Sequence, residues 1–169
     1  PTLDRQEEQG SRMTRVMLIS LIAAAVVGDQ LTKAAALSLL SQGTAVPVLP
    51  GFNLSLGFNT GASFGMMGGF MAGKPLLMAA LTGALTFAFA VMAFRAQNAL
   101  ERAGFALVVG GALGNIIDRL RQGAVTDFLD FYWRDWHWPT FNVADICITL
   151  GAVLILFGWL PLRRGKGPV

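Results

Sequence analysis

The sequence is poor in charged residues and has one cysteine and one histidine. Charged residues make up 14% of the 169 residues and hydrophobic residues 54%, which is far from the composition of soluble globular proteins. With Cys147 alone, an internal disulfide and a multi-cysteine metal site are excluded, and we expect a buried structural thiol. The lone His137, between Trp136 and Trp138, excludes a histidine-rich metal cluster and is expected at an interface, outside any catalytic site. No metal or cofactor is therefore expected.

The few basic residues indicate membrane topology. The formal net charge is +3 and the pI about 9.6, values that also occur in nucleic-acid-binding proteins. Here, however, the basic residues lie at the ends of apolar runs and do not cluster on one face with aromatic residues. We therefore expect a multi-pass integral membrane protein, formed by one membrane domain over residues 1–169, with membrane lipids and no nucleic acid among its partners.

Four apolar runs are long enough to predict transmembrane helices, at about 15–40, 75–94, 103–121 and 145–162. The first run follows basic residues as in a signal peptide, but no small-residue cleavage motif follows it, so it is interpreted as a retained helix. Basic residues flank the predicted spans on one side of the membrane: Arg5, Arg12, Arg15, Arg95, Arg102, Arg163, Arg164 and Lys166. This pattern places both termini in the cytoplasm and the loops 41–73 and 122–144 outside.

The first outer loop has the pattern of a small β-sheet. It carries prolines, many glycines and, over 41–73, no charged residue. Phe52, Leu54 and Leu56 alternate with Asn53 and Ser55, as in a half-buried strand. The following Asn-Thr-Gly at 59–61 predicts a turn that presents polar groups beside the sheet. The sequence thus predicts a mainly α membrane fold, with four transmembrane helices and a small β-sheet that lies on the outer membrane surface.

Polar residues within the predicted spans indicate helix contacts. Asp29 and Lys33 are four residues apart, so they share a helix face and are expected to pair and to tie the first helix to another. Asp118 is expected to form a local ion pair with its neighbour Arg119. The Gly-x-x-x-Gly spacing at 110–114 predicts close approach of a second helix.

The second outer loop is rich in aromatic residues, which indicates contact with lipid headgroups. These residues are Phe131, Tyr132, Trp133, Trp136 and Trp138. The two acids among them, Asp130 and Asp135, are expected to be solvated.

Asp127 and Asp145 stand apart because each is framed by apolar residues. Two carboxylates that meet in such surroundings cannot both ionise easily, so one proton is shared. The ionised carboxylate then activates a water against an amide carbonyl, and the protonated one donates to the developing oxyanion. Such a pair needs no metal and no covalent intermediate. The position of both acids near span ends predicts a protease working at a bilayer surface.

Two other functions account for intramembrane charges less well. A transporter or ion-conducting protein is expected to carry polar residues through the whole depth of the bilayer, whereas the second span has no charge and the polar groups gather at one end. A scaffold assembled through Gly-x-x-x-Gly leaves the outer aspartates without a role.

Five motifs, in order along nearly the whole chain, resemble those of the bacterial lipoprotein signal peptidases, the type II signal peptidases. The motifs are DQ at 29–30 with Lys33, FNTGASF at 58–64, GGALGN at 110–115 with Asp118 and Arg119, Gly123 with Val125, Asp127 and Phe128, and FNVAD at 141–145. Residues 1–11 and 66–74 match none of the family's motifs.

The resemblance implies a membrane aspartic endopeptidase that cuts prolipoproteins just before their diacylglyceryl-modified cysteine, in the bacterial inner membrane with its active site near the periplasmic face. The fold that it implies is a four-transmembrane-helix bundle with a small periplasmic β-sheet cradle. Asp127 and Asp145 match the family's catalytic pair. Residues that match positions supporting the pair or the substrate are Asp29, Lys33, Asn59, Gly61, Asn115, Arg119, Asn142 and Ala144. Inhibition by cyclic peptide antibiotics is a further expectation from the resemblance.

Overall fold

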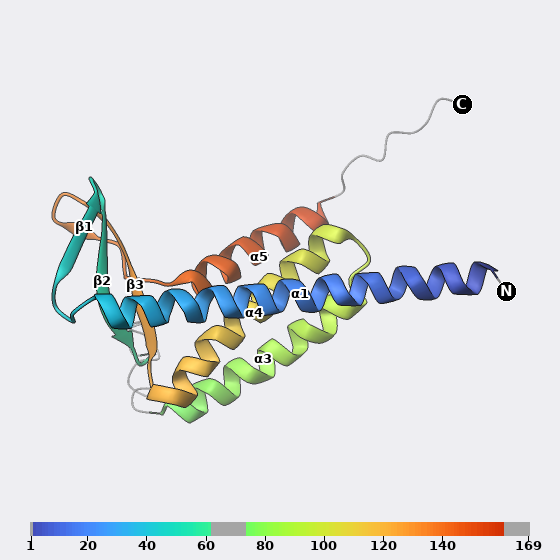
Figure 1. Cartoon of the computed structure of the whole chain (residues 1–169), viewed down its shortest axis with the longest axis horizontal. Coiled ribbons are helices and arrows are strands. Elements are labelled where there is room, and N and C mark those ends of the chain that lie inside the picture. The colour runs from blue at the N-terminus through green and yellow to red at the C-terminus, as the bar shows by residue number, and fades with distance from the viewer. Residues whose placement is uncertain (1, 62–73, 161–169) are drawn as a thin grey trace.

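The computed structural model describes residues 2–61 and 74–160, which form a helical bundle with a small antiparallel sheet at one end (Figure 1). The helices are α1 (Thr2–Leu39), α3 (Pro75–Arg95), α4 (Ala99–Gln122) and α5 (Val143–Trp159). The strands are β1 (Ala45–Leu49), β2 (Phe52–Asn59), β3 (Val125–Trp133) and β4 (Trp136–His137). The prediction of a mainly α fold with a small sheet is confirmed.

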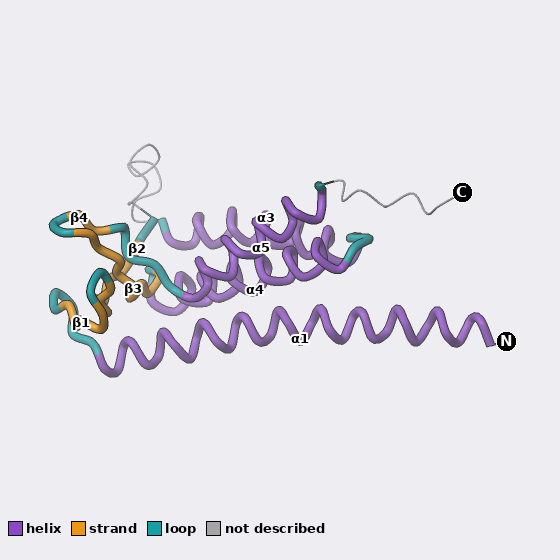
Figure 2. Tube along the Cα trace, turned by 90° about the horizontal axis from the view of Figure 1, so that it is seen from above, coloured by secondary structure: helices purple, strands orange, loops and turns teal. Residues whose placement is uncertain are grey.

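Helix α4 is the centre of the bundle. It packs against α1, α3 and α5, and more than half of its membrane-span window is buried, a far larger share than in α1 or α3. Figure 2 shows α1 along one side of the bundle and the sheet at the end away from the α3–α4 connection. Polar side chains of α4 near the sheet are therefore surrounded by protein on several sides.

Glycines let α4 lie close to two neighbours. A Cβ atom on Gly110 would lie 2.6 Å from the Cβ of Ala25 in α1, and one on Gly104 would lie 2.7 Å from the carbonyl oxygen of Gly151 in α5. Real side chains do not tolerate such distances, so only glycine allows these helix separations. The close approach predicted for the Gly-x-x-x-Gly spacing is confirmed, since a Cβ on Gly114 would likewise meet the side chain of Asp29 in α1.

Three described helices have the length and hydropathy of membrane spans: 15–39 within α1, 76–95 within α3, and α4. Helix α5 is also apolar but, with 17 residues, is shorter than these three. It begins at Val143, two residues before the predicted span, because Asn142 caps it. Helix α4 begins at Ala99, four residues before the predicted span, because the side chain of Asn98 accepts a hydrogen bond from the backbone N–H of Glu101. Residues 2–11, which match no motif of the family, continue α1.

The sheet is built from both predicted outer loops. Its strand order is β1-β2-β3-β4, and all pairs are antiparallel. The predicted strand at 52–56 is confirmed as part of β2, but its alternation changes at an irregularity between Leu54 and Gly57. Asn53, predicted on the polar face, is buried and donates to Oδ2 of Asp130 on the neighbouring strand at 3.2 Å. The strands β3 and β4 lie in a loop for which only an aromatic surface segment was expected.

Candidate active site

Asp127 lies in the part of β3 nearest to α4, and its side chain is almost fully buried, with 3% of the residue exposed. Antiparallel pairing with β2 sets Asp127 opposite Gly57, at the end of β2 that leads to Asn59. Because β3 follows directly on the C-terminal cap of α4 at Gly123, the strand brings Asp127 to the sheet end of the bundle.

Asp145 lies in the first turn of α5, where a capping box fixes it. The side chain of Asn142 accepts from the backbone N–H of Asp145 at 3.0 Å, and the side chain of Asp145 accepts from the backbone N–H of Asn142 at 3.3 Å. This reciprocal arrangement satisfies two backbone donors that a helix start leaves unpaired. The positive end of the α5 dipole also favours a negative charge on Asp145.

The side-chain amides of Asn142 and Asn115 join the two aspartates. Nδ2 of Asn142 donates to Oδ1 of Asp127 at 2.6 Å, and Nδ2 of Asn115 donates to Oδ1 of Asp145 at 2.9 Å. Nδ2 of Asn142 also lies 3.2 Å from Oδ1 of Asn115. Carboxyl groups from β3 and α5 thus belong to one hydrogen-bond network that crosses α4.

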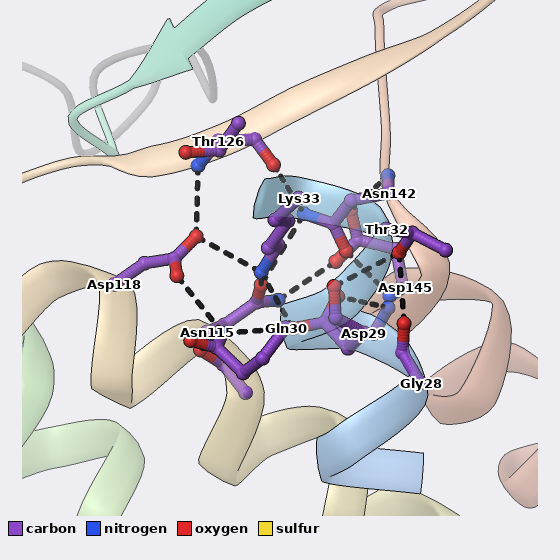
Figure 3. Close-up of polar contacts among 12 residues, drawn as sticks. Gly28, Asp29, Gln30, Thr32, Lys33, Asn115, Asp118, Thr126, Asn142 and Asp145 are labelled. Atoms are coloured by element: carbon purple, nitrogen blue, oxygen red, sulfur yellow. Dashed lines mark hydrogen bonds and ion pairs between the residues drawn. The ribbon is translucent and has the colours of Figure 1, made fainter. Parts of the chain in front are cut away.

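A buried ion cluster adjoins this network (Figure 3). Nζ of Lys33 lies 2.9 Å from Oδ2 of Asp29, as the four-residue spacing predicts, and 3.0 Å from Oδ2 of Asp118. The expected ion pair between Asp118 and Arg119 is wrong, because consecutive helical residues point about 100° apart and Asp118 faces α1. Oδ1 of Asp29 accepts from the backbone N–H of Ala144 at 2.9 Å, so the predicted tie between helices is confirmed.

A cavity of about 900 Å³ opens beside the two aspartates. Its polar lining includes Asp127, Asp145, Asn115, Asn59 and Arg119. The apolar part of the lining comes from β2, the segment before α5 and the first turns of α5: Phe58, Trp138, Pro139, Phe141, Ile146, Ile148 and Leu150. The cavity therefore has two carboxyl groups close together in its lining and an apolar surface along α5.

Asn59 and Gly61 form the predicted turn at the cavity rim. The side chain of Asn59 accepts from the backbone N–H of Gly61 at 2.8 Å, and Gly61 has a φ of 87°, which glycine adopts without strain. The remainder of the FNTGASF motif, residues 62–64, lies outside the described residues, as do 66–73.

Arg119 lines the same cavity from α4. Its guanidinium donates weakly to the backbone oxygen of Asn115 at 3.5 Å, and its Nε is buried with no hydrogen-bond partner among the described residues. The guanidinium group of Arg119 therefore contributes a cation to the wall of the cavity.

Burial and charge raise the pKa of Asp127 to about 6 from its usual 3.8. The largest cause is removal of the carboxyl group from water, and the second is repulsion from the carboxylate of Asp145. Hydrogen bonds from Asn142 and Asn59 and the charge of Lys33 oppose the increase. The carboxyl group of Asp127 therefore gains or loses a proton close to neutral pH.

Three expectations outside the site fare differently. Asp130 is not solvated but buried, because the alternation of β3 turns it inward, where it contacts Nδ1 of His137 at 2.8 Å and Nδ2 of Asn53 at 3.2 Å. Asp135 is exposed, as expected. Cys147 is free and only half-buried.

Asp118 and Gln30 belong to motifs quoted for the family resemblance but were not among the predicted site residues, and the structure places both beside the site. Nε2 of Gln30 donates to Oδ1 of Asp118 at 3.0 Å and to Oδ2 of Asp29 at 3.2 Å. A usable signal was present, since Asn115 and Asp118 are three residues apart and therefore share a face of α4. The contacts with α1 depend on helix packing, which the spacing does not reveal.

Comparison with known proteins gives consistent matches. The family model for signal peptidase (SPase) II matches residues 21–160. The lipoprotein signal peptidase of Burkholderia thailandensis is 40% identical over 162 residues, covering 95% of each chain. Two solved structures, both described as bacterial membrane enzymes, superpose with TM-scores of 0.74 and 0.75 at 30% and 29% identity; they cover 86% and 90% of this chain and 93% and 94% of their own.

Proposed function

The chain belongs to the signal peptidase II family, and on that premise we propose that it removes signal peptides from bacterial prolipoproteins with Asp127 and Asp145 as its catalytic pair. It is an aspartic endopeptidase of a bacterial membrane. The observation that carries the catalytic assignment is the hydrogen-bond network in which Asn142 contacts Asp127 and Asn115 contacts Asp145 beside a single cavity.

The chemistry assigns different roles to the two carboxyl groups. Asp145, in the first turn of α5, acts as the general base and takes a proton from a water as the water attacks the scissile carbonyl carbon. Asp127, with its raised pKa, donates its proton to the carbonyl oxygen. The tetrahedral diol then collapses: Asp145 returns its proton to the leaving nitrogen, Asp127 recovers a proton from one hydroxyl, and the C–N bond breaks.

The supporting residues act on position and charge. Asn142 and Asn115 hold the two carboxyl groups through their amides. Asn59 contributes a hydrogen bond to Asp127. Arg119 lines the cavity, where its guanidinium group donates to a carbonyl group of the substrate. Gly61 forms the turn at the rim, while Ala144, Asp29 and Lys33 lie behind the pair.

The cavity suits a lipid-modified peptide. It combines a polar end at the aspartates with an apolar wall formed by the exposed side chains of α5, which face the lipid-exposed surface of the bundle. We infer that the substrate's diacylglyceryl-modified cysteine enters from the side along α5 and that cleavage occurs immediately before this cysteine. The cyclic peptide antibiotics expected as inhibitors would occupy the same cavity.

The membrane arrangement that fits this substrate has four spans and the sheet on the periplasmic side. Helix α5, with 17 residues, is within the range of about 17–25 residues that cross a bilayer. Arg95 and Arg102 flank the α3–α4 connection at the end opposite the sheet (Figure 1), which favours a cytoplasmic location for that end. The whole chain then forms a single membrane domain with both termini in the cytoplasm.

Cleavage of a diacylglyceryl-modified prolipoprotein by the purified protein in detergent tests the function. Asp127→Asn and Asp145→Asn are each expected to abolish cleavage while leaving the fold intact, and Asp130→Asn, a buried acid of the same strand, is the matched control with activity retained. Activity is expected to survive chelators and serine-directed reagents. Full activity in either dyad variant would remove that aspartate from the mechanism.

A further inference from the structure

A buried polar cluster lies between α1 and α4, next to the hydrogen-bond network of the two aspartates. It consists of Asp29, Gln30 and Lys33 from α1 and Asp118 from α4, and we call it the Lys33 cluster. The three charged residues are almost completely buried, with exposed fractions of 0% for Asp29, 2% for Lys33 and 5% for Asp118. None of the four lines the cavity.

The two acids of the Lys33 cluster have matching sets of partners. Each carboxylate accepts from Nζ of Lys33, at 2.9 Å for Asp29 and 3.0 Å for Asp118. Each also accepts from Nε2 of Gln30, at 3.2 Å and 3.0 Å. The third donor in each case is a backbone N–H, 2.9 Å from Oδ1 of Asp29 and 3.0 Å from Oδ2 of Asp118.

The two backbone donors occupy equivalent places in the chain. The N–H bound by Asp29 belongs to Ala144, the residue immediately before Asp145. The N–H bound by Asp118 belongs to Thr126, the residue immediately before Asp127 (Figure 3). One cluster thus holds the main chain next to both aspartates, although these come from different elements, β3 and α5.

We propose that the Lys33 cluster is a positioning device that sets the separation of the two aspartates, with Asp118 holding the backbone before Asp127 and Asp29 holding the backbone before Asp145. The proposal rests on the proposed function, in which these aspartates share one water. Asp118, which sequence reasoning assigned to a local ion pair, is thereby a positioning residue for Asp127.

The positive charge of Lys33 stabilises the two buried carboxylates, and its Nζ makes a third contact, with Asn115. Two carboxylates buried side by side would repel each other without a cation between them. Nζ of Lys33 also donates to Oδ1 of Asn115 at 2.9 Å. Because that oxygen faces Lys33, the amide nitrogen of Asn115 faces Oδ1 of Asp145.

A cluster that merely joined α1 to α4 would need only its side-chain contacts. Lys33 with Asp118 already makes that connection. The hydrogen bonds to Thr126 and Ala144 extend it to β3 and α5, and they distinguish positioning from simple helix pairing.

Amide hydrogen exchange followed by NMR on the whole protein in detergent reads these contacts directly. In Asp118→Ala, the amide of Thr126 is expected to exchange at least about 10-fold faster while that of Ala144 stays protected. In Asp29→Ala, the pattern is expected to reverse. Equal loss of protection at both amides in both variants, or no change in either, would overturn the proposal.

Kinetics then separate positioning from a structural role. Asp118→Ala is expected to lower kcat about 100-fold, as ångström-scale misplacement of a catalytic group does, with KM changed less than about 3-fold. Asp118→Asn keeps an oxygen that accepts from the N–H of Thr126, so it is expected to recover most of the lost kcat. The control is Asp130→Ala, which removes a buried acid from β3, the strand of Asp127, outside the cluster.

The outcomes for this inference and for the proposed function are separable. If the amide of Thr126 alone exchanges faster in Asp118→Ala but kcat is unchanged, the positioning role is overturned. A loss of kcat in Asp118→Ala that is no greater than in Asp130→Ala, or that Asp118→Asn does not relieve, would also overturn it. Failure of the proposed function would appear instead as an active Asp127→Asn variant, while the exchange measurements would still report whether the cluster holds the two backbone segments.

Discussion

Nδ2 of Asn142 lies 2.6 Å from Oδ1 of Asp127, although the two residues belong to different elements. The same side chain caps α5 by accepting from the backbone N–H of Asp145 through its oxygen. One amide therefore ties the start of a helix to a buried carboxyl group in the sheet. Folding of α5 and assembly of the site depend on the same residue.

Replacement of this amide is expected to reduce both stability and activity. Asn142→Ala removes a helix cap, which costs about 1 kcal/mol, and frees the carboxyl group of Asp127 to rotate. We expect kcat to fall about 100-fold from that misplacement. Thermal unfolding and prolipoprotein cleavage in detergent measure the two effects.

The chain offers a matched control for this change at Asn98. Asn98 caps α4 through the backbone N–H of Glu101 at 2.8 Å and donates to the carbonyl oxygen of Gly158 at 3.2 Å, at the end of the bundle away from the sheet. Asn98→Ala is expected to lose similar stability but to retain activity. Equal losses of kcat in the two variants would mean that Asn142 acts on the fold alone.

The pH dependence of cleavage should report the proton on Asp127. The pKa of this carboxyl group is raised to about 6, and the mechanism requires the group to be protonated. We therefore expect kcat/KM to decrease above about pH 6, and to fall about tenfold per pH unit well above that pH. A kcat/KM profile that stays flat from pH 5 to 8 would contradict the assignment of Asp127 as the proton donor.

The same raised pKa predicts a pH-dependent cost to stability. Between pH 3.8 and about 6 the folded protein holds a proton on Asp127 that the unfolded chain has lost, so this group's contribution is full below pH 3.8 and is lost as the pH rises through 6. The loss is of the order of 3 kcal/mol. Unfolding free energies of wild type and Asp127→Asn, compared at pH 4 and pH 7, should therefore diverge in favour of the variant at pH 7. If the difference in unfolding free energy between wild type and Asp127→Asn is the same at pH 4 and pH 7, the pKa of Asp127 is not raised in the folded protein.

The separation of α4 and α5 should be sensitive to a single methyl group. Gly104→Ala places a Cβ 2.7 Å from the carbonyl oxygen of Gly151 and 2.8 Å from Cγ1 of Ile155, so we expect a loss of about 1–3 kcal/mol from overpacking. Gly83→Ala in α3 meets nothing within 4 Å and is expected to be neutral or to gain up to about 1 kcal/mol from helix propensity. Thermal unfolding of both variants provides the comparison, and equal stability would contradict close packing at Gly104.

Tryptophan fluorescence tests the placement of the sheet at the membrane surface. Trp133, Trp136 and Trp138 are exposed on the β3–β4 hairpin, whereas Trp159 lies at the far end of α5. With Trp159→Phe, lipids brominated close to the headgroup are expected to quench more strongly than lipids brominated at the chain ends, because tryptophan prefers the interface. Weak quenching by both lipids would place the hairpin away from the bilayer.

The sequence alone determined those properties that local chemistry controls. Long uncharged runs predicted the membrane helices, since few other structures satisfy backbone hydrogen bonds in lipid. The spacing of Asp29 and Lys33 predicted their ion pair, and the order of the motifs predicted the family. The selection of Asp127 and Asp145 from among the acids also came from their apolar neighbours, and their catalytic role stays a prediction.

Tertiary structure decided which polar groups face one another. The partner of Asp118 is Lys33, 85 positions earlier in the chain, and not its neighbour Arg119, because α1 packs against one face of α4. Asp130 is buried because it belongs to β3, a strand that the aromatic composition of this loop did not predict. Hydrogen bonds and ion pairs reach only about 3 Å, so they depend on helix separation and strand register. Periodicity and composition specify which residues form an element and which face they occupy, but the elements meet only when the whole chain has packed.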